Sequence, residues 1–202
     1  MNVVERARNI ITTPNSEWNT INTEVPVANT IITNYVLPLA GLAAIAAFIG
    51  YGLIGFNSFN LHFGGINWGL YQAISIICNA IFSVYVTAFV VDLLAPSFGS
   101  EKNFSKSLQL VAYSFTPAWI GGLLAIFPPV AFIGALFGLY GLYLMYIGLP
   151  KLKHTPEDKH ISYFVVILIV TIVVYIIIGW ILTTILMNIF GLSYHVGTVD
   201  LR

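Results

Sequence analysis

Long apolar stretches without charged residues fill most of the chain, and two of them follow each other closely. Residues 108–127 and residues 130–149 contain no charged residue, and only Pro128 and Pro129 separate them. A helix of about 20 residues is roughly 30 Å long, which matches the hydrocarbon thickness of a bilayer. Because a two-residue joint leaves no room for a domain, this pattern predicts a transmembrane hairpin.

Three further apolar stretches complete the pattern. Residues 25–91 include no formally charged residue, and a polar break at residues 57–68 divides this interval into two. The halves predict spans near residues 35–56 and 70–95, and a stretch rich in β-branched residues predicts a span near residues 161–187. The fold class that we expect is an all-α integral membrane protein with five transmembrane helices.

The first 30 residues are more polar than the rest. Val3, Ala7 and Ile10 recur at helical spacing, while Arg6 falls elsewhere, which predicts a short amphipathic helix on the membrane surface. A flexible tail is the alternative for this segment. We divide the chain into an interfacial segment, a five-span membrane domain and a short outside tail, which are residues 1–30, 31–190 and 191–202.

The composition excludes a soluble domain. Hydrophobic residues make up 58% of the 202 residues and charged residues 8%, whereas a soluble domain contains about 25% charged residues. The net charge of zero argues against binding to nucleic acid. The single cysteine, Cys78, allows no intrachain disulfide. The polar residues 1–24 argue against a cleavable signal peptide.

The basic residues predict the orientation in the membrane. With the N-terminus cytoplasmic and the C-terminus outside, the cytoplasmic segments contain seven of the eight Lys and Arg residues, and only Arg202 lies outside. Short cytoplasmic loops of membrane proteins show this excess of positive charge. The seven residues are Arg6, Arg8, Lys102, Lys106, Lys151, Lys153 and Lys159.

Polar residues form a stripe along each of two predicted spans. They recur at steps of three and four on the second span and at steps of four on the fifth, where Gly179 occupies one step. Such stripes fit either hydrogen bonds between helices or the wall of a polar pathway. We favour hydrogen bonds, because an ion pathway usually places an ionisable group near the midplane and these spans have none. The stripe residues are Gln72, Ser75, Asn79, Ser83, Thr87, Thr171, Tyr175 and Thr183.

The fourth predicted span has a face of small residues. Gly134 and Gly138 form a GxxxG motif, and Gly141, Met145 and Gly148 continue the same narrow face. Glycine faces of this kind let membrane helices approach closely. The pattern predicts a packing seam, either within the chain or between copies of it.

Candidate chemistry is sparse. Asp92 is the carboxylate beside an apolar stretch, just before the helix stop at Pro96. We expect an interfacial anchor at the helix end, paired with Lys102, with a functional site as the alternative. The segment from Thr155 to Asp158 predicts a capping box at the start of the fifth span.

No catalytic or cofactor motif stands out. His154, Glu157, Asp158 and His160 include metal-ligating types, but they lack a matching cluster elsewhere in the sequence. A nucleophile–base pair, a phosphate-binding glycine loop and a cofactor fingerprint are also missing. We therefore expect no cofactor, no metal and no enzymatic activity.

Several segments resemble the Yip domain family of five-span membrane proteins. The resemblance covers nearly the whole chain, from residues 13–18 of the tail to residues 156–163 at the start of the fifth span. It also includes residues 92–96, 111–119 and 139–149. The resemblance implies that the candidate functional or structural residues are those in the matching segments, namely Asp92, Pro96, Tyr113, Pro117, Pro156, Asp158 and Lys159.

The resemblance implies a function as well as a fold. Eukaryotic members act in Golgi and endoplasmic-reticulum vesicle traffic as scaffolds rather than enzymes, and the family is named for interacting with Rab-type GTPases. This chain lacks their long cytosolic N-terminal region, so Rab binding is doubtful. It is similar to bacterial members, which implies an inner-membrane scaffold in contact with the lipid bilayer, with other membrane proteins, or with itself through glycine faces. The alternative is a small-solute or ion transporter or channel that uses the polar faces of spans two and five.

Overall fold

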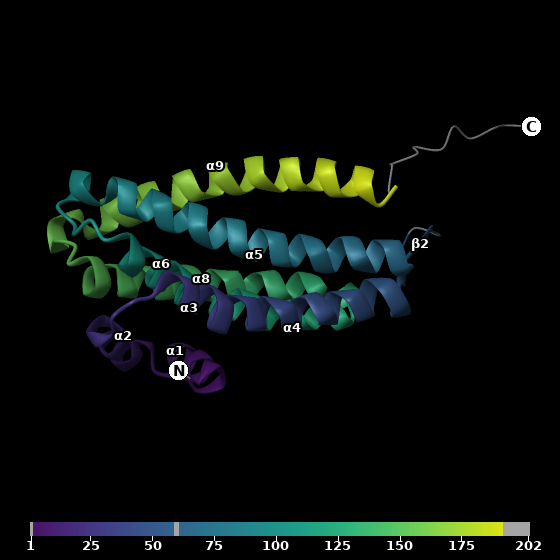
Figure 1. Ribbon diagram of the computed structural model, residues 1–202, viewed down its shortest axis with the longest axis horizontal. Coiled ribbons are helices and arrows are strands. Elements are labelled where there is room, and N and C mark those ends of the chain that lie inside the picture. Colours follow the sequence, from purple (N-terminus) through teal and green to yellow (C-terminus); the bar gives the residue numbers. More distant parts are fainter. Residues whose placement is uncertain (1, 59–60, 192–202) are drawn as a thin grey trace, which may run out of the picture.

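Five long helical segments lie side by side in the computed structural model, which describes residues 2–58 and 61–191 (Figure 1). All five are long and apolar enough to cross a membrane, which confirms the predicted fold class. Their bounds are Ala28–Ile54, Ile66–Phe98, Phe104–Ile126, Pro128–Lys153 and Glu157–Ile189. The outside tail predicted over residues 191–202 lies, apart from Gly191, beyond the described part.

The first two spans are joined by a short hairpin. Span one consists of α3 (Ala28–Ile31), the π-helical turn η1 (Ile32–Val36), α4 (Leu37–Ala47) and a second π-helical turn, η2 (Phe48–Ile54). Strands β1 (Phe56–Ser58) and β2 (Leu61–Phe63) pair antiparallel, with Phe56 opposite Phe63. Span two is α5 (Ile66–Leu94), which ends in the 3₁₀ turn η3 (Ala95–Phe98). The backbone groups are thus paired within each span, as hydrocarbon requires.

Proline divides the third span. The span consists of α6 (Phe104–Ser114), α7 (Thr116–Gly122) and η4 (Leu123–Ile126). Pro117 has no N–H to donate to the carbonyl of Tyr113 four residues earlier. The Thr116 hydroxyl donates to that carbonyl instead at 2.7 Å, and it also lies 2.7 Å from the Tyr35 hydroxyl. The break is therefore held by the side chains of Thr116 and Tyr35.

The predicted hairpin continues through η5 (Pro128–Val130) into α8 (Ala131–Lys153), and its glycine face packs within the chain. A Cβ atom on Gly134 would lie 2.4 Å from the Gly121 carbonyl oxygen. A Cβ atom on Gly141 would lie 2.6 Å from the backbone carbonyl oxygen of Ser114. These two glycines let α8 approach span three closely, whereas within the described residues no other helix comes within 4 Å of a Cβ on Gly138. The last span is a single helix, α9 (Glu157–Ile189).

The N-terminal segment is helical and docked, not a flexible tail. Helices α1 (Val3–Thr12) and α2 (Pro14–Thr23) lie against one end of the bundle (Figure 1). Trp18 is wholly buried, and a Cβ on Gly148 of α8 would lie 2.7 Å from its ring. Arg6 is also buried, although its position in the sequence predicts the polar side of α1.

The segments that contain the seven basic residues meet at one end of the bundle, where the α5–α6 and α8–α9 connections also lie (Figure 1). The predicted orientation can be tested with single cysteines at the exposed positions Lys102 and Asn67, in a Cys78→Ala background. We expect Asn67→Cys to react with a membrane-impermeant maleimide in intact cells, and Lys102→Cys to react only after permeabilisation. The opposite labelling pattern would invert the orientation.

Candidate functional site

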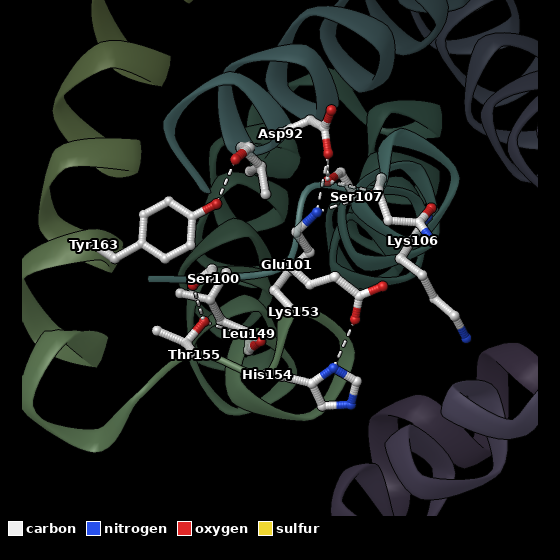
Figure 2. A network of polar contacts seen from close by, with 12 residues as sticks. Asp92, Ser100, Glu101, Lys106, Ser107, Leu149, Lys153, His154, Thr155 and Tyr163 are labelled. Carbon is white, nitrogen blue, oxygen red and sulfur yellow. Dashed lines mark hydrogen bonds and ion pairs between the residues drawn. The ribbon is translucent and has the colours of Figure 1, made fainter. Parts of the chain in front are cut away.

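Polar side chains gather where the α5–α6 connection meets the end of α8 (Figure 2). Pro96 lies in η3, and the left-handed Gly99, with φ of 66°, turns the chain after it. Asn103 then begins α6 by accepting a hydrogen bond from the Lys106 N–H at 3.1 Å. These turns bring the last residue of α8, Lys153, under the end of α5.

Asp92 and Lys153 form an ion pair in this position. The Lys153 Nζ atom lies 3.0 Å from Asp92 Oδ1 and donates to the Asn103 carbonyl at 3.1 Å. The Ser107 hydroxyl also donates to Asp92 Oδ1, at 3.2 Å. The side chain of Lys153 is 0% exposed and that of Asp92 is 11% exposed. We call Asp92, Asn103, Ser107 and Lys153 the Asp92 cluster.

The expected pairing of Asp92 with Lys102 is therefore wrong. Lys102 is exposed on the α5–α6 connection, whereas the partner comes from 61 residues away. Proximity in sequence favours Lys102, but the fold places Lys153, a buried lysine at the end of α8, next to the carboxylate. Asp92 is a buried, paired residue rather than an exposed anchor.

The expected capping box is also absent from the start of α9. Pro156, not Thr155, is the N-cap residue. The Thr155 hydroxyl accepts from Ser100 at 2.8 Å and donates to the Leu149 carbonyl at 3.4 Å. Thr155 thus ties the α8–α9 connection to the α5–α6 connection. Asp158, in the first turn of α9, is exposed and favourable to the helix dipole.

Further contacts join α9 to the end of α5. The Tyr163 hydroxyl donates to the Val91 carbonyl (Figure 2). The Tyr163 ring stacks on Phe98, with the ring centroids 4.9 Å apart. The Pro156 ring lies against Gly99, where a Cβ would be 3.4 Å from it. Lys159 of the same family motif is exposed.

The histidines of this region have partners other than a metal. His154 Nδ1 lies 2.8 Å from Glu101 Oε2, and His160 Nε2 lies 2.8 Å from the Tyr146 carbonyl. Within the described ranges, no three His, Cys, Asp or Glu side chains are grouped so that they could hold a metal ion. His154 therefore joins the α8–α9 connection to the α5–α6 connection, and His160 joins α9 to α8.

A second charged cluster holds the N-terminal helices. Arg6 pairs with Glu17 at 2.5 Å and with Glu24, and its guanidinium lies 5.4 Å from the centre of the Tyr113 ring. Burial acts to lower the pKa of Arg6, but its hydrogen bond to Glu24 and the charges around it raise this pKa above the ordinary value. We call Arg6, Glu17 and Glu24 the N-terminal clamp. Sequence reasoning missed it, although two acids in the tail beside an apolar face were a signal.

Lysines from the bundle complete the docking. Lys106 Nζ donates to the carbonyls of Asn22 and Glu24 at 2.7 and 3.0 Å, which satisfies the C-terminal end of α2. Lys151 Nζ donates to the Asn15 carbonyl at 2.6 Å. Helices α1 and α2, the α5–α6 connection and the α8–α9 connection therefore form one surface, which we call the polar platform.

The polar stripes meet in the membrane interior. A cavity of about 470 Å³, which we call the intramembrane cavity, is lined by Asn79 and Ser83 of α5 and by Thr171 and Tyr175 of α9. The other stripe residues are not among its lining residues: Gln72, Ser75, Thr87 and Thr183. The stripes thus form a local pocket in an otherwise apolar interior rather than a continuous polar pathway.

The hydrogen bonds in the stripes run mostly along the helices. Asn79 donates to the Ser75 carbonyl at 2.9 Å, and Ser83 donates to the Ala80 carbonyl at 3.4 Å. Ser83 of α5 and Tyr175 of α9 line the same cavity. Among the described residues, the buried hydroxyls of Thr87 and Thr171 have no partner. Interhelical hydrogen bonding therefore explains only part of the pattern.

Sequence reasoning missed Ser114 as a lining residue. It is wholly buried, its hydroxyl has no partner in the described structure, and it lines the intramembrane cavity. The helix break before Pro117 was the signal that could have found it, because the residues at such a break do not follow the helical stripe.

The whole membrane domain has known relatives. The family model described as Yip1 domain matches residues 8–195. The chain is similar to the inner membrane protein YohC of Escherichia coli K12, with 27% identity over 155 residues that cover 74% of this chain and 80% of the relative. YohC of Escherichia coli O6:H1 gives the same identity and coverage. No solved structure matches.

Proposed function

Because the chain belongs to the Yip1 domain family, we propose that it is a non-enzymatic scaffold that organises other components of the inner membrane. Membership confirms the resemblance drawn from the sequence. The five spans make the chain a multi-pass integral membrane protein, and its YohC relatives share the predicted inner-membrane location. The scaffold role goes further than these facts and rests on the polar platform.

The platform is the observation that supports a scaffold most directly. Three parts of the chain are tied together there by Lys151, Lys153 and the N-terminal clamp. Binding costs less when the surface is already ordered, because loops and side chains need not be immobilised on association. The exposed charges on this surface include Glu101, Lys102, Glu157, Asp158 and Lys159.

The two charged clusters are suited to structure rather than to catalysis. Asp92 and Lys153 are buried and hydrogen-bonded to the loops that they join. A general acid or base must come within hydrogen-bonding distance of a substrate, and these groups are enclosed by the protein. This geometry favours a non-enzymatic role.

The intramembrane cavity favours a scaffold over an ion transporter. Its lining residues include no Asp, Glu, Lys, Arg or His in the part of the chain that the structure describes. Intramembrane ion and proton pathways are marked by such groups. The transporter alternative is therefore supported only by the uncharged polar residues of the cavity.

Two measurements separate the scaffold from the transporter. A photo-crosslinking amino acid at the exposed Lys159 should give adducts with other membrane proteins, whereas the same group at the lipid-facing Trp180 should give mainly lipid adducts. Purified protein in liposomes should show no saturable ion or solute uptake above empty vesicles. Saturable uptake that disappears in Asn79→Leu but persists in Thr87→Val would contradict the scaffold proposal.

A further inference from the structure

We propose that the intramembrane cavity binds the head group of a membrane-soluble quinone. This ligand is a neutral, planar ring with carbonyl oxygens on opposite edges. The inference goes beyond the scaffold role and does not depend on it. It rests on the depth of the cavity, on its walls, and on two buried hydroxyls that lack partners.

The depth of the cavity restricts the ligand to molecules that dissolve in the membrane. Thr171 lies 12 positions after Lys159 on α9, and Asn79 lies 13 positions before Asp92 on α5. At about 1.5 Å per residue, both lining residues are roughly 18–20 Å from the charged end of the bundle. With no charged residue in its described lining, the cavity would also reject an ionic ligand.

The walls of the cavity suit a flat ring. Its volume of about 470 Å³ lies within the usual range for small-molecule sites. Phe115 and Trp119 of span three and Tyr175 of α9 lie along its walls, and the rings of Phe115 and Tyr175 are 6.3 Å apart. Gly138 of α8 leaves room, because no other helix of the described structure comes within 4 Å of the place where its Cβ would be. Aromatic side chains bury planar rings favourably by offset or edge contacts.

Two unpartnered hydroxyls select the chemistry of the ligand. Ser114 and Thr171 are lining residues, and their buried hydroxyls have no hydrogen-bond partner within the described residues. A buried hydroxyl without a partner costs free energy that a ligand acceptor can recover. An alkyl chain would leave both hydroxyls unsatisfied.

The placement of the two hydroxyls favours two acceptors over one. Ser114 ends α6 and Thr171 lies in α9, and both helices pack against α5 and α8. The two lining residues therefore come from different helices. An alcohol or a single ester carbonyl can satisfy one of them, whereas a quinone presents a carbonyl oxygen to each side.

Quenching of tryptophan fluorescence by decylubiquinone tests the proposal in the full-length protein, reconstituted in nanodiscs. We expect saturable quenching that is largely lost in Trp119→Phe, because Trp119 lines the cavity. The Ser114→Ala/Thr171→Val double variant should weaken the apparent affinity at least about tenfold, since both donors are removed. Thr87→Val is the matched control, because it removes an unpartnered buried hydroxyl outside the cavity lining.

A second pair of variants tests the site by filling it. Gly138→Leu should abolish quenching, whereas Gly179→Leu should leave it unchanged. Both glycines have open space at the Cβ position, but only Gly138 is among the lining residues. This pair keeps the proposal testable if the double variant fails to fold.

Three results would overturn the proposal. One is unchanged affinity in the folded double variant, and another is unchanged quenching in Gly138→Leu. The third is equal competition by decylbenzene, which has a ring and a tail but no carbonyl, because the cavity would then accept any alkylated ring.

Discussion

Replacing Lys153 with methionine should destabilise the folded protein by about 3–5 kcal/mol, the usual cost of removing one partner of a buried ion pair. Methionine keeps much of the shape of lysine but removes the charge next to Asp92. The carboxylate would stay buried with Ser107 as its remaining side-chain donor in the Asp92 cluster. Unfolding in mixed detergent micelles, followed by circular dichroism against the SDS fraction, measures the change.

Two companion variants show whether the lost partner is responsible. Lys102→Met removes an exposed lysine ten residues from Asp92 in sequence and should change stability by no more than about 0.5 kcal/mol. The double variant Asp92→Leu/Lys153→Met should recover most of the loss, because no buried charge remains. Equal stability of Lys153→Met and the wild type would show that the pair does not hold the loops together.

Trp18→Ala should release the N-terminal helices from the bundle. The side chain is wholly buried against Gly148, and truncation of a buried tryptophan costs about 3–5 kcal/mol. Since α1 and α2 are joined to span one by a short linker, we expect this loss to be local. Hydrogen exchange in nanodiscs should show rapid exchange over residues 3–23 and little change in α8.

Trp180→Ala is the matched control for this effect. Trp180 of α9 is 72% exposed to the surroundings of the bundle, so its removal should leave the protection of α1 and α2 intact. Retained protection in Trp18→Ala would mean that the polar contacts of these helices, including those with Lys106 and Lys151, are enough to keep them docked.

Local patterns were sufficient to predict the spans. Each span depends on about 20 consecutive apolar residues, so composition alone locates it. The second span was expected over residues 70–95 and covers Ile66–Phe98. The predicted and observed ends differ because the helix continues past the apolar stretch. After Asp92, the 3₁₀ turn η3 extends the span to Phe98.

Contacts between distant parts of the chain could not be predicted in the same way. Asp92 and Lys153 are 61 residues apart, and neither position indicates the other in sequence. Arg6 was assigned by periodicity to the polar side of a surface helix, yet Glu17 and Glu24 pair with it against the bundle. An ion pair can thus bury a charge that periodicity alone would leave in solvent.

The stripes predicted most of the polar residues that line the cavity. Helical periodicity identified Asn79, Ser83, Thr171 and Tyr175, which all line the intramembrane cavity. It could not identify Ser114, because the break at Pro117 takes this residue out of the regular helical pattern. The open space at Gly138 depends on the packing of the neighbouring helices, which a single glycine in the sequence does not reveal.

The docked N-terminal segment also has a consequence for biosynthesis. Asn15 and its partner Lys151 are 136 residues apart. At about 5–20 residues per second, a ribosome needs about 7–27 s to pass from one to the other. For most of that time Trp18 has been made but Gly148 has not, so the contact between α2 and α8 cannot yet form. Docking of the N-terminal helices on α8 is therefore a late step of assembly that requires the fourth span.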